Sequence, residues 1–199
     1  MAFGDFSFPQ VQTAFQLTQQ EADMFGSVPE LSLRPEFVRA LMDDANLAVA
    51  LNTEKARSEF VIAPVLLEVR RLMGASFGLF SGVDLNVDPG RGLNGVCDFL
   101  ITKSPHRYVM TSPILTIFEA KNDNIRSGLG QCISAMVAAQ AFNLNQGSLA
   151  MTIYGCVSTG SNWLFLKLEA SAVTFDMREH QIANVAKIMA IIKTIVDSF

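Results

Sequence analysis

Apolar and polar residues follow one another in blocks of different period along this chain. Between Ser76 and Val87 the apolar residues recur at alternate positions, which is the two-residue period of a β-strand. A turn-forming segment, Asp-Pro-Gly-Arg-Gly at 88–92, separates this strand from a second apolar run, Val96–Thr102. The two segments are therefore predicted to form a hairpin. A polar loop over 103–112 leads to a third predicted strand, Ile114–Lys121.

Helical segments flank these strands. One helix is predicted from Pro35 to about Ala50, with proline in its first turn, and a second from Thr53 or Glu54 to Met73. Pro64 lies inside the second helix and should kink or divide it, because proline cannot donate a backbone hydrogen bond. The segment Arg126–Phe142 is apolar nearly all round and is predicted to be a buried helix, and Glu179–Val196 a closing amphipathic helix.

Two more strands, Leu149–Val157 and Trp163–Leu168, are predicted after the buried helix. The order is then helix, three meandering strands, helix and strand. A helix between the third and fourth strands favours a parallel pair with a right-handed crossover. The predicted fold class is α/β (α+β), a mixed sheet with helices on both faces and the core order αβββαβ.

Composition limits the possible classes of protein. The 199 residues are half apolar, enough for one domain with a substantial core. No run approaches about eighteen apolar residues, so no membrane span is expected. The first residues lack the basic start of a signal peptide, and the odd number of cysteines fits buried free thiols, so a cytoplasmic location is expected. The net charge of −4 gives no general attraction to nucleic acid.

The first fifty-two residues differ from the rest. Residues 1–30 show no clear period yet carry many aromatic side chains: Phe3, Phe6, Phe8, Phe15 and Phe25. Residues 1–52 are therefore predicted to be a helical and aromatic arm that packs on a core domain, 53–199. The arm is also predicted to form the interface of a possible homodimer.

The candidate chemistry lies in two apolar runs. Asp98 falls within Val-Cys-Asp-Phe-Leu-Ile, and Glu119 and Lys121 fall within Ile-Phe-Glu-Ala-Lys. Residues i and i+2 of a strand share a face, so Glu119 and Lys121 should point the same way. Buried charges persist only when they are paired, hydrogen-bonded or metal-bound. Two acids and a lysine on one sheet face suggest a divalent-metal site with a cationic partner.

With the order of elements, these residues resemble the PD-(D/E)XK nuclease superfamily. Its signature is a helix glutamate, an acid on the second core strand, Glu-x-Lys on the third, and often a glutamine on the next helix. The matching residues are Glu59, Asp98, Glu119, Lys121 and Gln131. The resemblance spans about Thr53 to Val157, and no proline precedes Asp98.

The resemblance implies Mg²⁺- or Mn²⁺-dependent hydrolysis of phosphodiesters, with DNA as the expected substrate. It implies that Asp98 and Glu119 bind the metal, with Glu59 as an outer ligand. Lys121 would stabilise charge on the phosphate or orient the attacking water, and Gln131 would position substrate or water.

The helix glutamate can be chosen by periodicity. At 100° per residue, Glu59 falls on the same apolar arc as Ile62 and Leu66, whereas Glu68 falls on the opposite side. A carboxylate on a buried face needs a reason, so Glu59 is the predicted site residue. Glu54 is the second choice, because an early helix start would bring it inward.

Alternatives stay open at this stage. The acids and lysine could form a structural salt bridge in a nuclease-like fold that only binds or scaffolds, or the site could act on RNA or a small phosphoester. Loop cations are expected to border the site and contact phosphates, although they could simply be solubilising residues: Arg91, Lys103, His106, Arg107 and Arg126.

Overall fold

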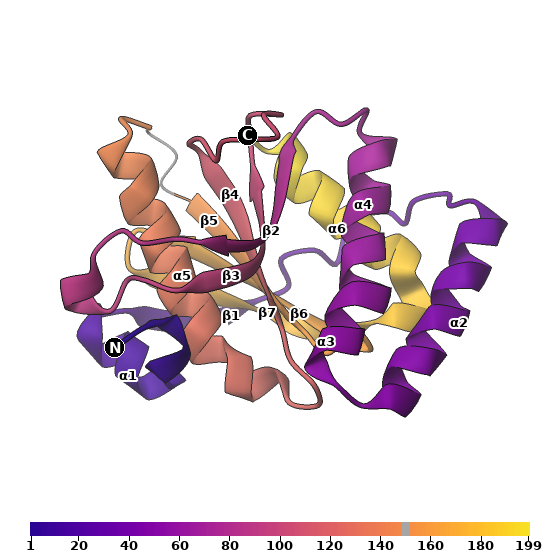
Figure 1. Cartoon of the computed structure of the whole chain (residues 1–199), viewed down its shortest axis with the longest axis horizontal. Coiled ribbons are helices and arrows are strands. Elements are labelled where there is room, and N and C mark those ends of the chain that lie inside the picture. The colour runs from indigo at the N-terminus through magenta and orange to yellow at the C-terminus, as the bar shows by residue number, and fades with distance from the viewer. Residues whose placement is uncertain (149–151) are drawn as a thin grey trace.

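The computed structural model describes residues 1–148 and 152–199. In this part of the chain, seven strands form one mixed sheet in the order β1-β7-β6-β5-β4-β3-β2 (Figure 1). The strands are β1 (Thr18–Ala22), β2 (Gly78–Asp84), β3 (Val96–Thr102), β4 (Ile114–Ala120), β5 (Thr152–Ser158), β6 (Asn162–Glu169) and β7 (Ala172–Gln181).

Helices cover both faces of the sheet (Figure 1). They are α1 (Phe8–Ala14), α2 (Pro35–Leu51), α3 (Glu54–Arg57), α4 (Ala63–Leu72), α5 (Ile125–Asn145) and α6 (Val185–Asp197), and a π-helical segment, η2 (Ser58–Ile62), joins α3 to α4. One apolar core lies under α5 and the N-terminal residues and includes Leu100, Ile117 and Met136. The other lies under α2, α4 and α6 and includes Leu66 and Phe118.

The predicted order of core elements is confirmed. Strands β2 and β3 form an antiparallel hairpin, β4 is antiparallel to β3, and β5, reached through α5, is parallel to β4. Pro64 lies in the first turn of α4, directly after η2, and the backbone stays helical from α3 through η2 into α4, so the predicted division is observed only as a π-helical segment within one continuous helix. The three cysteines are buried free thiols, as predicted.

Three predicted boundaries were wrong or incomplete. The first thirty residues contain α1 and β1, and β1 joins the sheet parallel to β7. The closing helix begins at Val185 rather than Glu179, since Glu179 belongs to β7. Strand β7 bonds to β1 on one side and to β6 on the other, and this long-range pairing leaves little local signal. The predicted strand Leu149–Val157 is observed as β5, with 149–151 outside the described residues.

The aromatic N-terminal residues pack on their own chain. Phe3, Phe6 and Phe25 are buried, and the Phe3 amide donates a hydrogen bond to the Asn94 carbonyl in the β2–β3 connection. The homodimer stays a prediction. Within the described ranges, no helix has the length and apolar character needed to cross a membrane.

Candidate active site

Asp98 and Glu119 lie on neighbouring antiparallel strands. The register pairs Leu100 of β3 with Ile117 of β4 and ends with the pair Phe99 and Phe118, so Asp98 and Glu119 each adjoin the last paired residue of their strand. The charge of Asp98 raises the pKa of Glu119, so the two carboxyl groups lie near each other at this end of the sheet.

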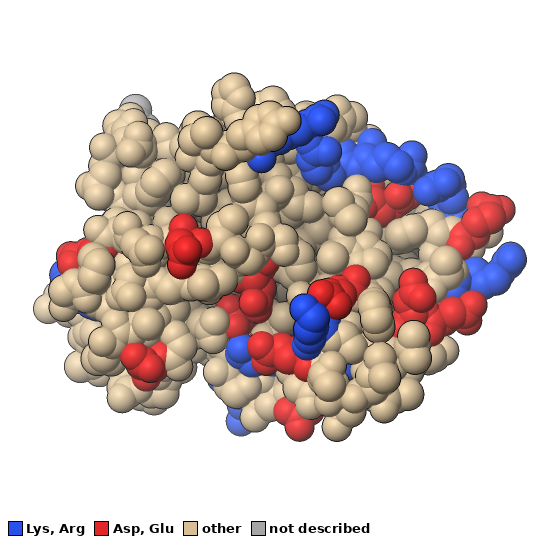
Figure 2. All heavy atoms as spheres, in the orientation of Figure 1, with Lys and Arg blue, Asp and Glu red and all other residues tan. Residues whose placement is uncertain are grey.

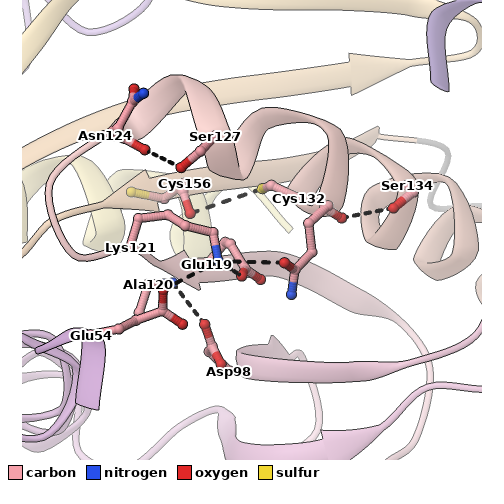
Figure 3. Close-up of polar contacts among 11 residues, drawn as sticks. Glu54, Asp98, Glu119, Ala120, Lys121, Asn124, Ser127, Cys132, Ser134 and Cys156 are labelled. Carbon is pink, nitrogen blue, oxygen red and sulfur yellow. Dashed lines mark hydrogen bonds and ion pairs between the residues drawn. The ribbon is translucent and has the colours of Figure 1, made fainter. Parts of the chain in front are cut away.

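Glu119 is the centre of the cluster, with 2% of the residue exposed. Its Oε1 accepts a hydrogen bond from Lys121 Nζ at 2.7 Å (Figure 3). The same ammonium lies 3.4 Å from Gln131 Oε1 and 3.6 Å from a carboxylate oxygen of Glu54. Residues from β4, α5 and α3 therefore meet at one ammonium group.

Asp98 connects this buried cluster to solvent. Its Oδ2 accepts a hydrogen bond from the backbone N–H of Ala120 at 2.8 Å, at the end of β4 (Figure 3). Asp98 also lines a cavity of about 350 Å³, together with Glu54, Glu59 and Ser81. We call this cavity the active-site hollow.

The electrostatics show that the site has excess negative charge. The pKa of Glu119 is raised to about 8, because burial, the largest cause, and the charge of Asp98 outweigh the opposing effect of Lys121. Burial alone would lower the pKa of Lys121, but Glu119, Glu54 and Asp98 together hold it above its ordinary value. Burial, Glu119 and Asp98 also raise the pKa of the Cys97 thiol to about 12. A further positive charge would be stabilised here.

A glycine in α5 explains how closely this helix approaches the site. The Asn124 side chain caps the start of α5 by accepting a hydrogen bond from the Arg126 N–H at 2.9 Å. One turn later, a Cβ on Gly128 would lie 2.9 Å from Cγ of Lys121 and 2.7 Å from Cγ1 of Val157. Only glycine leaves room for the lysine stem against the helix. Periodicity did not single out Gly128, although the sequence Gly-Leu-Gly-Gln is visible.

The structure corrects the expected burial of the helix glutamates. The Glu59 side chain is 52% exposed and pairs with Lys55 at 2.9 Å, although it lines the active-site hollow. Glu68, expected on the wet side, is 7% exposed and is held by Arg34 and Arg71. The sequence prediction assumed a regular α-helix with 3.6 residues per turn. Segment η2 is π-helical, and its wider turn changes the angle about the helix axis at which every residue after Glu59 points. Glu54, the second choice, makes the closer contact with Lys121.

The expected position of the loop cations was wrong in part. Lys103, His106 and Arg107 lie in the connection from the end of β3 to the start of β4, whereas Asp98 starts β3. Four strand residues, roughly 13 Å, separate Asp98 from this end of the strand. Arg91 packs over the Phe15 ring, 5.1 Å from its centroid.

Arg126 lies on the site's side of the sheet. It is exposed in the first turn of α5, which begins shortly after Lys121 leaves β4. Among the five cations expected to contact phosphates, Arg126 is the one that follows β4 directly, at the end of the strand next to Glu119 and Lys121.

The donor set fits a hard cation with few protein ligands. Asp98 Oδ2 and Glu119 Oε1 have hydrogen-bond partners, and each carboxylate has a second oxygen to offer. In residues 1–148 and 152–199, no group of three or more His, Cys, Asp or Glu is arranged to hold a metal. Mg²⁺ is commonly bound through only one or two carboxylates and keeps several waters. The pair Asp98 and Glu119 is therefore compatible with Mg²⁺ or Mn²⁺.

Comparison with known proteins does not assign the chain. No protein-family model matches it, and no curated protein is similar to it in sequence.

Proposed function

We propose that this protein has a restriction-endonuclease-like core and hydrolyses phosphodiesters in DNA with Mg²⁺ or Mn²⁺. The observation that carries the proposal is the Glu119–Lys121 ion pair at the end of β4 next to Asp98 of β3, which accepts a hydrogen bond from Ala120, acts on the Glu119 carboxyl by its charge and lines a hollow open to solvent. The core order αβββαβ and the contribution of Gln131 from α5 support the same proposal.

Each residue has a distinct role in this reaction. Asp98 and Glu119 would hold the cation, and the raised pKa of Glu119 gives a reason for the cation to bind there. The cation, when bound, supplies Lewis-acid polarisation of the phosphate and activation of a water molecule. Lys121, charged and fixed against Glu119, would stabilise the negative charge that develops on the phosphate. Gln131 would orient Lys121 or the attacking water.

The bond changes balance without any other cofactor. The oxygen of water bonds to phosphorus, the bond from phosphorus to one sugar oxygen breaks, and this oxygen takes up a proton. Glu54 and Glu59 line the hollow where the water would approach, and either carboxylate could accept the proton that water releases.

The test is cleavage of plasmid, linear duplex and single-stranded DNA with Mg²⁺, Mn²⁺ or EDTA. We expect metal-dependent cleavage that is lost in Asp98→Asn and kept in Asp43→Asn, a matched change at an exposed acid of α2. Absence of cleavage of every substrate, or full activity of Asp98→Asn, would reject the proposal in favour of a binding or scaffolding role.

A further inference from the structure

Two hollows open between the same pair of elements. The active-site hollow touches Ala63 of α4 and Ser81 of β2, and a second hollow of about 300 Å³ touches Leu67, Arg70 and Leu79 of the same elements. Residues 63, 67 and 70 are spaced i, i+4, i+7 and lie on one face of α4. Residues 79 and 81 lie on one face of β2. Each hollow is thus bordered by α4 and the edge strand β2, and we call the line along which these elements meet, with both hollows, the furrow.

The two ends of the furrow carry opposite charge. Asp98, Glu54 and Glu59 line one end, and Arg70 with His106 and Arg107 lines the other. Figure 2 shows this separation, with acidic residues in the lower centre of the face and Lys and Arg along the upper right rim.

The cations at the far end are available to a ligand. Among the described residues, no carboxylate lies within ion-pair distance of Arg70, Lys103 or Arg107, and the last two side chains are exposed. Arg70 Nε donates a hydrogen bond to the Phe77 carbonyl at 3.2 Å, which fixes its guanidinium beside the hollow. Such a cluster is suited to phosphates.

The dimensions fit one strand of nucleic acid. Glu59 and Arg70 are eleven residues apart along η2 and α4, so the furrow is roughly 16 Å long at about 1.5 Å per residue. This length corresponds to about five nucleotides of a stacked strand at about 3.4 Å each. Each hollow has the volume of a small-ligand site, enough for one nucleotide. Tyr108, 98% exposed next to Arg107, offers a ring on which an unpaired base can stack.

We propose that this furrow binds a single strand of nucleic acid. The strand would place one phosphate at Asp98, later phosphates on Arg70, Arg107 and Lys103, and a base on Tyr108. The inference rests on the proposed function for the direction of the path, because the acidic end must be where cleavage occurs. Binding at the cationic end does not depend on catalysis.

The test is fluorescence anisotropy in EDTA with labelled oligo-dT, oligo-rU and duplex DNA, each of about 15 nucleotides or base pairs. We expect a single strand to bind at least about tenfold more tightly than the duplex. Tighter binding of oligo-dT or of oligo-rU identifies DNA or RNA as the preferred strand. Binding of either one supports the proposal that the furrow holds a single strand.

The variants locate the contact. The double variant Lys103→Ala/Arg107→Ala should weaken single-strand binding at least about tenfold and reduce the slope of log affinity against log salt by about 1.4, for two lost phosphate contacts. Tyr108→Ala should weaken binding about tenfold, near the lower end of base–aromatic stacking. Lys193→Ala, which removes a charge on α6, is the matched control and should bind as wild type.

The outcomes separate this proposal from the catalytic one. Unchanged affinity of the double variant, no single-strand binding, or tighter duplex binding would overturn the furrow. Intact single-strand binding without metal-dependent cleavage would overturn the catalytic proposal and leave the furrow standing. Asp98→Asn should lose cleavage and, because it removes a negative charge beside the bound strand, should not weaken single-strand binding in EDTA.

Discussion

The titration of Glu119 should be visible in the stability of the metal-free protein. Its pKa is raised to about 8 in the folded chain, from an ordinary value of 4.5. The folded protein therefore keeps a proton that the unfolded chain has released, so this contribution to stability is complete below pH 4.5 and is lost as pH rises through 8. Each pH unit is worth about 1.4 kcal/mol where only the folded chain holds the proton, and folded Glu119 is half-ionised at pH 8, so the free energy of unfolding should fall by about 2 kcal/mol from pH 6 to 8.

Glu119→Gln removes the charge and keeps the shape. The variant should match wild type below about pH 4, where the folded and unfolded chains both hold the proton, and be more stable by about 2 kcal/mol at pH 6 and by about 4 to 5 kcal/mol at pH 8 to 9. Glu59→Gln is the matched control, because Glu59 is half-exposed and should leave the pH dependence as in wild type. The assay is urea unfolding in EDTA at each pH, compared as differences from wild type so that titrations common to all proteins cancel.

The response of the melting temperature to metal gives a second test of Glu119. At pH 8, Mn²⁺ should raise the melting temperature of wild type, because an ion that binds only the folded state stabilises it by mass action. Glu119→Gln should show little of this rise. Parallel pH dependences for wild type and Glu119→Gln would refute the reasoning, since Glu119 would then be ionised throughout and simply paired with Lys121.

Other changes give separate tests. Lys121→Ala should abolish cleavage in a gel assay. It should also lower the metal-free stability by about 1–3 kcal/mol in a thermal melt, because the acids lose their partner. Full Mg²⁺-dependent cleavage by this variant would indicate a structural salt bridge. Gly128→Ala should lower stability by about 1–3 kcal/mol in urea unfolding and reduce cleavage, because the new Cβ displaces the Lys121 stem. Glu68→Gln should lower the free energy of unfolding by about 2 kcal/mol near neutral pH. The Arg71 hydrogen bond lowers the pKa of Glu68, so wild type should lose this advantage as pH falls below the ordinary carboxyl range, and a constant difference down to pH 3 would contradict it.

The strands that carry the candidate site could be predicted from local pattern alone. The segment that became β2 has a two-residue period, those that became β3 and β4 are short apolar runs, and a turn with proline and glycine separates the first two. Once β3 and β4 are antiparallel neighbours, Asp98 near the start of one and Glu119 near the end of the other lie at the same end of the sheet. The proximity of these acids was therefore accessible from the sequence.

Features set by long-range contacts were not accessible. Strand β1 depends on pairing with β7, more than 150 residues later, and its sequence, Thr-Gln-Gln-Glu-Ala, has no apolar strand period. The exposure of Glu59 and burial of Glu68 depend on a π-helical segment that regular periodicity cannot represent. The loop cations could not be assigned to an end of the sheet until the direction of β3 and β4 was known.

The central claim is that Asp98 and Glu119 together bind a divalent cation. It is tested most directly by anomalous diffraction from crystals grown at pH 8 with millimolar Mn²⁺. The account predicts a manganese peak within roughly 2.5 Å of a carboxylate oxygen of both residues, in the range of oxygen ligands for hard divalent cations. An empty position between them, with the Glu119–Lys121 ion pair intact and manganese bound elsewhere or nowhere, would contradict it.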